Sequence, residues 1–479
     1  MELVSDLIGD LGKYQIWISF LILLNKFGAG FHLMAFVYLA PPVKYSCPGK
    51  AVCCDNPIYN KENFTRTIVM EFNLICDRAW LRDLSNILFQ VGVIIGCLVC
   101  GILSDRFGRK PILIACVIIE VLTGLMTSFL PDYWSFTIIR MILGFSIGGI
   151  LAIGYVLMIE YIGLNIRHVA AALFHVPFTV AHLLLALLGY WIIKDYVYFQ
   201  LGISLSTAIL LLYICFLPES PRWLIAVNKT NDAIKLLEKI AKINNRPVDL
   251  VRHRIDLYLL TQRNQTPGSF KNLFTESNLR KNILIMIFMW LIHSYSFYGV
   301  SQYIFYLTGN VNINVLVSGL VCLLATLLAI PLLKFFKRKI IIMAACLICS
   351  LCLLIITFVP DGYGLVALGC IGLLCDFTTF VVIYLYCCEM FPTIVRNTAL
   401  GLSLMMARIG AATAPLVLEI RPHCKWCVSI VFCCFPLIAA LMCVFLPETK
   451  DHDLMTTIEE GEAFGKTPRQ LSSDNATTT

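Results

Sequence analysis

Long apolar runs recur along the chain, and they constrain its fold more than any other feature. A helix of about 20 apolar residues crosses a hydrocarbon core about 30 Å thick. Runs of about this length are found at Gln15–Tyr38, Leu84–Leu103, Pro111–Leu130, Tyr133–Ile159, Ile166–Ile193, Tyr198–Leu217, Lys281–Leu307, Val311–Leu333, Ile340–Val359, Gly362–Cys388, Val395–Leu418 and Trp426–Leu446. The sequence therefore predicts an all-α polytopic membrane protein with about twelve transmembrane helices.

Composition supports this class and excludes others. Of the 479 residues, 59% are hydrophobic and 14% are charged. One soluble core cannot hide so much apolar surface, because such cores stop growing at about 300 residues. The net charge of +7 does not indicate nucleic-acid binding, since the basic residues lie in loops between apolar runs. No spacing of His, Cys or acidic residues resembles a metal site, and no nucleotide-binding loop is present. We therefore expect a lipid bilayer around the protein, no cofactor and no enzymatic activity.

Basic residues set the expected orientation, because cytoplasmic loops are enriched in Lys and Arg. The connections Pro131–Asp132 and Pro360–Asp361 contain none, whereas the long loop Pro221–Arg280 is rich in them. The loops after the second and eighth runs are also basic, with Arg106, Arg109, Lys110, Lys334, Lys337, Arg338 and Lys339. An even number of spans then places both termini and the central loop in the cytoplasm.

The first external connection, residues 39–83, carries features of an extracellular segment. An oxidising compartment allows its four cysteines to form disulfides, in any of three pairings, between Cys47, Cys53, Cys54 and Cys76. The same loop holds the sequon Asn63-Phe-Thr. We therefore expect glycosylation at Asn63.

Three correspondences reveal an internal repeat. The motif Phe216-Leu-Pro-Glu-Ser matches Phe445-Leu-Pro-Glu-Thr, and two further pairs share its separation of 229 positions: Glu160 with Glu389, and Arg167 with Arg396. Parallel repeats of this kind are typical of the major facilitator architecture. We expect an N-terminal half at residues 1–218, a cytoplasmic linker at 219–280, a C-terminal half at 281–449 and a cytoplasmic tail at 450–479.

The loop Gly101–Lys110 contains the parts of a conformational latch. Glycine permits a tight turn and close helix contact, and fixed charges favour one of two packings, as alternating access requires. We assign to this latch Gly101, Asp105, Arg106, Gly108, Arg109, Glu160, Arg167, Glu389 and Arg396. The alternative is that these residues only anchor the loop. Lys334 replaces Asp105 in the second copy, which we therefore expect to have decayed.

Several motifs are similar to those of a known family. Gly101–Lys110 matches the loop signature of the major facilitator superfamily. Other segments resemble its organic-ion branch (organic cation, organic anion and carnitine transporters), namely Gly9-Asp-Leu-Gly-Lys-Tyr-Gln15, Glu71-Phe-Asn-Leu-Ile-Cys76, Glu219-Ser-Pro-Arg-Trp-Leu224, Tyr298-Gly299, Glu389-Met-Phe-Pro-Thr-Ile-Val-Arg-Asn397 and Leu446-Pro-Glu-Thr-Lys450 with Thr457-Ile-Glu-Glu460. The resemblance implies two pseudo-symmetric six-helix bundles. It also implies carriage of small organic ions across the plasma membrane by alternating access, with a coupling ion or an exchanged counter-substrate as a further partner.

Charges inside the apolar runs are the candidate substrate contacts, because buried charges in membranes are costly and usually functional. Arg408 lies within the eleventh run. In the family that the chain resembles, a basic residue at this position is typical of the anion and carnitine carriers. Arginine's planar fork suits a carboxylate. The alternative for Arg408 is an ion pair with Asp376 of the tenth run. Lys26 is equally a substrate contact or the partner of Glu120.

Aromatic rings provide further candidates. Tyr298 and Tyr384 are expected to face the substrate, because such rings hold a cation or stack on an aromatic group. Our main hypothesis is a secondary carrier for small organic anions or zwitterions. The first alternative is an organic-cation carrier that uses Glu120 and Asp376, and the second is a degenerate transporter that acts as a receptor or scaffold.

Overall fold

The computed structural model describes residues 3–41, 43–47, 54, 57–62, 64–163, 166–191, 194–212, 216–227, 229–262, 272–305, 311–359, 362–418, 425–450, 452, 455 and 458–465. Helices dominate this part of the chain. Polar residues cap several of them: Asp132 accepts a hydrogen bond from the backbone N–H of Ser135 at 2.9 Å, and the Ser220 hydroxyl accepts one from Trp223 at 3.2 Å, ahead of Pro221 at the first helical position.

The N-terminal elements are α1 (Leu3–Ile8), α2 (Lys13–Met34), α3 (Phe36–Leu39), β1 (Tyr45–Ser46), β2 (Ile58–Tyr59), α4 (Ile68–Glu71), η2 (Cys76–Arg78), α5 (Trp80–Phe107), α6 (Arg109–Met126), α7 (Tyr133–Tyr161), α8 (Arg167–Leu173), α9 (Val176–Trp191), α10 (Tyr196–Ala208) and η4 (Ile209–Leu212). The remaining elements are α12 (Pro221–Ala226), α13 (Thr230–Ile243), α14 (Leu250–Gln262), α15 (Asn272–Thr275), α16 (Ser277–Phe305), α17 (Val311–Phe335), α18 (Arg338–Ile356), α19 (Tyr363–Met390), α20 (Thr393–Leu418), α21 (Lys425–Cys443) and α22 (Ile458–Ala463).

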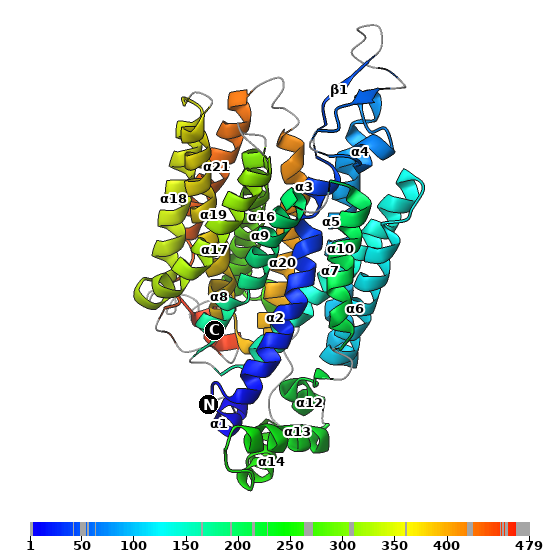
Figure 1. Ribbon diagram of the computed structural model, residues 1–479. Coiled ribbons are helices and arrows are strands. Elements are labelled where there is room, and N and C mark those ends of the chain that lie inside the picture. Colours follow the sequence, from blue (N-terminus) through cyan, green and yellow to red (C-terminus); the bar gives the residue numbers. More distant parts are fainter. Residues whose placement is uncertain are drawn as a thin grey trace. The chain divides into compact units, whose positions relative to one another are not determined.

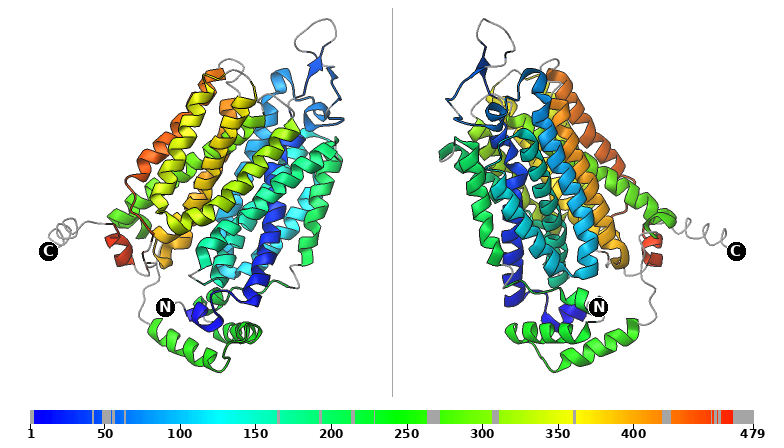
Figure 2. Two further views of the ribbon diagram at one scale, coloured as in Figure 1. Left: turned by 60° about the vertical axis from the view of Figure 1, so that its left-hand side comes forward. Right: turned by 90° about the vertical axis from the view of Figure 1, so that its right-hand side faces the viewer.

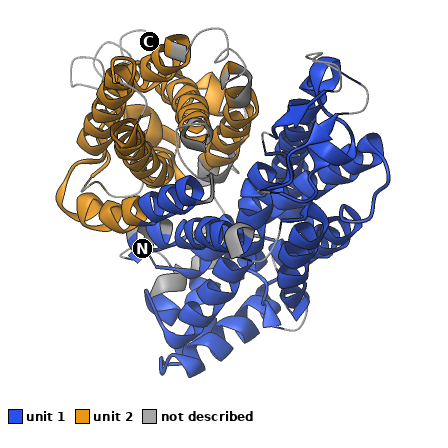
Figure 3. Cartoon of the chain, turned by 45° about the horizontal axis from the view of Figure 1, so that its top comes forward, with its two compact units in different colours: residues 1–262, 309–323 blue, residues 263–308, 324–479 orange. Residues whose placement is uncertain are grey.

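The chain divides into two compact units (Figure 3). Unit 1 contains residues 1–262 and 309–323, and unit 2 contains residues 263–308 and 324–479. The division at residues 218, 280 and 449 remains a prediction from the sequence.

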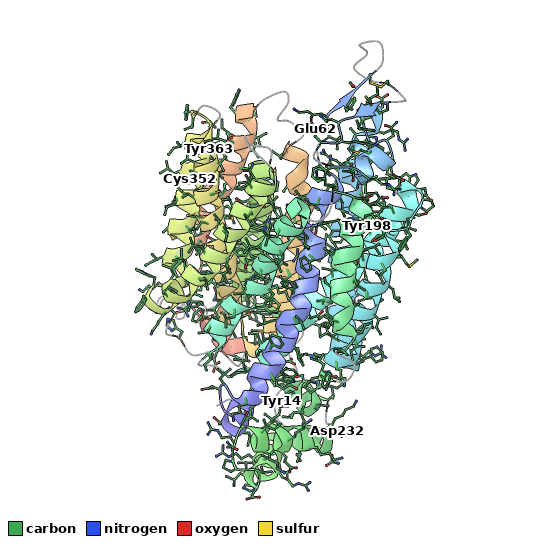
Figure 4. The ribbon with its side chains drawn as sticks, viewed as in Figure 1. Tyr14, Glu62, Tyr198, Asp232, Cys352 and Tyr363 are labelled. Atoms are coloured by element: carbon green, nitrogen blue, oxygen red, sulfur yellow. A yellow bond between two sulfur atoms is a disulfide. The ribbon has the colours of Figure 1, made fainter. Side chains whose placement is uncertain are left out.

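Unit 1 is a helical bundle with smaller elements at both ends. Within it α5 packs against α7, α6 against α7 and α10, and α2 against α7 and α9. Helices α12, α13 and α14 lie with α1 at one end of α2. The hairpin formed by β1 and β2 lies at the other end of the bundle (Figures 1 and 2). Figure 4 shows Tyr14, at the start of α2, near α13, on which Asp232 lies. There the backbone N–H of Tyr14 donates to Asn244, which follows α13, at 3.2 Å.

The β1–β2 hairpin contains a disulfide. Strands β1 and β2 pair antiparallel, with Tyr45 opposite Tyr59. Cys47 and Cys54 are disulfide-bonded, with their Cα atoms 5.8 Å apart, and Cys76 is disulfide-bonded as well. The structure therefore selects a Cys47–Cys54 pairing among those that the sequence left open.

Unit 2 repeats part of the packing of unit 1. Helix α18 packs against α19 and α21 as α6 packs against α7 and α10, and α16 packs against α20 as α2 packs against α9. The helix ends agree as well: Arg109 begins α6 and Arg338 begins α18, whereas Tyr161 ends α7 and Met390 ends α19. Both pairs are separated by 229 positions, which is the separation found in the sequence.

The expected spans are found as helices. Eight described helices are long and apolar enough to cross a membrane, and three shorter apolar ones lie at Val176–Leu188, Tyr196–Leu212 and Ala399–Ala414. With α6 these account for the twelve apolar runs. Large apolar side chains on the bundles remain exposed, among them Ile102, Leu122 and Leu205, as expected of surfaces in contact with lipid.

Candidate functional site

An ion-pair cluster joins α5, α6 and α7 near the ends of these helices. The Arg109 guanidinium lies 3.3 Å from a Glu160 carboxylate oxygen, and both side chains are largely buried. The same guanidinium donates to the carbonyl of Ser104 at 2.9 Å. Glu219 accepts hydrogen bonds from the backbone N–H groups of Arg109 at 2.9 Å and of Lys110 at 3.3 Å. A carboxylate at this position complements the positive N-terminal end of α6.

A second cluster of the same kind lies in unit 2. Arg338 contacts Glu389 through two nitrogen–oxygen pairs, at 3.0 and 3.1 Å, and donates to the carbonyl of Leu333 at 2.8 Å. Glu448 accepts from the backbone N–H of Arg338 at 3.0 Å and of Lys339 at 3.2 Å. The expectation of a decayed second copy is therefore wrong for the ion pair, because the arginine and both glutamates are retained.

Gly108 is required between α5 and α6. Its φ of +112° is in the left-handed region, and a Cβ atom there would meet the Glu219 carboxylate and Trp223. Gly101 differs, because a Cβ atom built on it meets nothing within 4 Å. Arg106 is exposed and lies over the ring of Phe107.

The structure places the remaining latch candidates by their backbone alone. Asp105 lies in α5, Arg167 begins α8 and Arg396 lies in α20, and none of their side chains is among those described. Asn63 lies outside the described residues.

In unit 2 the structure brings together two substrate candidates. The Arg408 guanidinium of α20 donates a hydrogen bond to the Tyr298 hydroxyl of α16 at 3.2 Å, with both side chains buried. The ion pair considered between Arg408 and Asp376 does not form. Instead, Asp376 of α19 lies 3.7 Å from Nδ1 of His293 of α16. Helix α16 thus presents a neutral phenol to the arginine and an imidazole to the acid.

Tyr384 lies in an aromatic cluster of unit 2. Its ring packs edge-on against Trp290, with the ring centroids 4.5 Å apart, and against Phe380 at 5.5 Å. Edge-to-face geometry is favourable for such rings. The structure therefore gives Tyr384 a packing partner on both α16 and α19.

In unit 1, Lys26 and Glu120 do not meet. The Lys26 ammonium lies 3.5 Å from the ring centroid of Phe174, a cation–π contact. Both Glu120 carboxylate oxygens are buried and accept no hydrogen bond from the described residues. Gly28, not Lys26, faces Glu120, and positions two apart on a helix point to different sides.

Comparison with known proteins decides the family. The description "Sugar (and other) transporter" matches residues 77–460. The chain belongs to this family. A Drosophila melanogaster "Organic cation transporter protein" is 32% identical over 425 residues, which are 87% of this chain and 77% of the relative. "Solute carrier family 22 member 6-A" of Xenopus laevis is 30% identical over 430 residues, 88% of this chain and 77% of the relative. Within the family, the chain is therefore a membrane transporter of solute carrier family 22, and not an enzyme.

Solved structures confirm the fold. The inward-open xylose transporter XylE from E. coli aligns with a TM-score of 0.69 and 18% identity, over 94% of this chain and 99% of the other. The transporter thus has the major facilitator fold of two six-helix bundles, as the repeat in its sequence predicts.

Four residues of these clusters were missed as site residues in the sequence. They are Glu219, Arg338 and Glu448 of the two ion-pair clusters, and His293 beside Asp376. The separation of 229 positions relates Arg109 to Arg338 and Glu219 to Glu448, so this signal was sufficient for three of them. No sequence signal related His293 to Asp376, because their contact depends on how α16 and α19 are rotated.

Proposed function

We propose that this transporter carries small organic anions or zwitterions by alternating access. The relatives named for organic cations and the family 22 members support an organic ion as the substrate. The observation that favours a carboxylate is the Arg408–Tyr298 contact. The guanidinium fork matches a carboxylate in shape and hydrogen bonding.

The two ion-pair clusters are proposed as the latches of the transport cycle. Each binds the turn between two helices to a third helix and to a glutamate that follows a later helix. Such a cluster favours the packing in which it forms, because a buried charge that loses its partner is strongly destabilised. Asp105, Arg167 and Arg396 are proposed to act with these clusters on the basis of the sequence.

We also propose the plasma membrane as the location, with both termini cytoplasmic and Asn63 glycosylated. The basic loops support this orientation. Terminal epitope tags should bind antibody only after cells are permeabilised, and glycosidase treatment should increase the gel mobility of the wild type but not of Asn63→Gln. Antibody binding to intact cells would contradict the orientation.

The substrate class is tested by uptake into proteoliposomes that contain the full chain. The probes are radiolabelled hippurate, L-carnitine and tetraethylammonium, which are an aromatic carboxylate, a zwitterion and a quaternary cation. Wild type should take up the first two saturably. Arg408→Ala should reduce this uptake by about 10- to 100-fold, the equivalent of about 1.5–3 kcal/mol for a hydrogen bond to a charged group. Thr413→Val, on the same helix and bonded to the carbonyl of Ile409, should retain uptake.

Other results would select the alternatives. Uptake of tetraethylammonium alone, insensitive to Arg408→Ala, would favour the cation carrier, for which Glu120 and Asp376 are the candidate attracting charges. Absence of saturable uptake for every probe would favour a receptor or scaffold.

A further inference from the structure

Glu120 is a fully buried acid near the middle of α6. Its side chain has 0% exposure, and both carboxylate oxygens accept no hydrogen bond from any residue that the structure describes. Neither ion-pair cluster includes it. A buried polar group without a partner is costly, so such a residue requires an explanation.

The surroundings of this carboxyl are apolar and close. A Cβ atom built on Gly28 of α2 would lie 3.1 Å from Glu120 Oε1 and 2.7 Å from the methyl group of Thr207 of α10, with Leu210 of η4 next in order. The carboxyl therefore lies where α2, α6 and α10 meet, and only glycine at position 28 leaves it room.

The titratable groups on the neighbouring elements do not neutralise it. Helix α2 contributes Lys26, whose ammonium lies on the Phe174 ring, and His32, which is one turn beyond Gly28 and near Gly124. Arg140 of α7 lies over the ring of Phe89. On α6 itself, the Cys116 thiol donates a hydrogen bond to the Cys100 sulfur of α5. None of these groups donates a hydrogen bond to Glu120 within the described chain.

The charge state follows from this environment. An ionised carboxylate without a partner is excluded from an apolar interior far more strongly than a neutral acid. In the packing described, Glu120 therefore carries its proton. To lose the proton it needs water, and water reaches it only if α2, α6 and α10 separate. Protonation and helix packing are thus linked, and whatever shifts one shifts the other.

We propose that Glu120 is the binding site of a coupling proton, which moves in the same direction as the organic anion. The proton comes from water on one side of the membrane and forms an O–H bond with the Glu120 carboxylate. On the other side this bond breaks, the electron pair stays on the carboxylate and the proton returns to water. One proton offsets the single negative charge of the substrate. The identity of the co-transported anion rests on the proposed function, whereas the proton site at Glu120 does not.

Proton binding is measured first, on purified full-length protein in detergent. A pH jump in weakly buffered solution with a pH-indicating dye counts the protons released between pH 5 and pH 10. Wild type should release about one proton more than Glu120→Gln, a variant that preserves the size and neutrality of the protonated acid. Glu120→Asp should regain this proton, and Thr127→Val should match wild type, since the Thr127 hydroxyl, just after α6, donates to the carbonyl of Gly124.

Coupling is measured next, by hippurate accumulation in proteoliposomes under an imposed gradient of one pH unit, acid outside. One coupled proton multiplies the accumulation ratio by up to about tenfold. Wild type and Thr127→Val should show this gain, and Glu120→Gln should lose it. Size-exclusion chromatography checks that each variant is folded.

The outcomes separate the two proposals. Equal proton release from wild type and Glu120→Gln would overturn the inference. It would also be overturned if His32→Gln lost the pH-driven increase in hippurate accumulation while Glu120→Gln kept it. If wild type releases about one proton more than Glu120→Gln but takes up none of the probes, the proton site is supported and the proposed function is contradicted. Uptake that does not respond to the pH gradient, in a protein with the extra proton, would overturn coupling while it leaves the proposed function standing.

Discussion

The ion pair between Arg66 and Glu71, in the loop between α3 and α5, shows how much one exposed charge pair contributes to stability. Arg66 donates to both carboxylate oxygens of Glu71, at 2.7 and 2.6 Å. This hydrogen bonding lowers the pKa of Glu71 from its ordinary value of 4.5, with a smaller opposing effect of burial. The side chains are 45% and 33% exposed, so solvent screens the pair and limits its contribution to about 1 kcal/mol or less.

The pH dependence of this pair has a definite sign. A folded-state pKa below the unfolded value means that the pair stabilises the protein above about pH 4.5 and that this stabilisation is lost as the pH falls through the folded pKa. Glu71→Gln should therefore unfold at a lower temperature than wild type at pH 7, and the difference should shrink as the pH falls below about 4.5 through the folded pKa. Thermal unfolding in detergent measures it. Glu62→Gln, at an exposed carboxylate of the same loop, is the control, and a Glu71 difference that does not shrink as the pH falls would contradict the assignment.

Residue pairs were the hardest feature to predict from the sequence. The sequence singled out Arg408 and Tyr298, and the structure joins them. It did not predict that Asp376 meets His293 or that Lys26 lies on Phe174. Hydropathy shows that a segment is buried, but the partner of a buried charge depends on helix rotation, which one sequence does not determine.

At the scale of elements, α5 and α7 illustrate how small residues set helix contacts. A Cβ atom on Gly92 or Gly96 of α5 would meet the carbonyl groups of Met141 or Phe145 of α7, and Gly144 and Gly148 of α7 face α5 in the same way. Close approach of helix backbones in membranes depends on such positions.

A matched pair of substitutions in α5 tests this contact. Gly96→Ala places a methyl group against the Phe145 carbonyl and should cost about 1–3 kcal/mol of stability through overpacking. Gly101→Ala, on the same helix, meets open space and should be neutral or slightly stabilising, because alanine is the better helix former. Thermal unfolding of the purified variants gives the comparison. Equal destabilisation by both would mean that the contact with the Phe145 carbonyl does not decide the result.

Element boundaries show both the strength and the limit of hydropathy. Each of the twelve apolar runs forms helix in its described residues, but the run Ile166–Ile193 contains two helices, α8 and α9, with residues 174 and 175 between them. Pro177 has no N–H to donate to the carbonyl of Leu173, so the helix breaks there. The hydropathy of the run does not indicate this break, whereas the proline in its sequence does.

For the whole molecule, the duplicated ion-pair clusters carry the main consequence of the repeat. Arg109, Glu160 and Glu219 have counterparts in Arg338, Glu389 and Glu448, each 229 positions later. The sequence showed this duplication, yet it suggested that the second latch was lost, because Lys334 replaces Asp105. The retained pairs show that charge reversal at one position leaves the rest of the cluster intact.

If both clusters act as latches, they should fail in the same way. Lysine keeps the positive charge of Arg109 or Arg338. Its ammonium lacks the planar fork with which the guanidinium binds a carboxylate and a helix-end carbonyl at the same time. Arg109→Lys and Arg338→Lys should each reduce the initial rate of hippurate uptake by about tenfold, the equivalent of about 1.4 kcal/mol. Uptake is normalised to the amount of protein, and Lys337→Arg, at an exposed position beside the second cluster, serves as the control. A loss confined to Arg109→Lys would show that the second cluster only holds unit 2 together, whereas equal losses would mean that the transporter uses both copies of its duplicated latch.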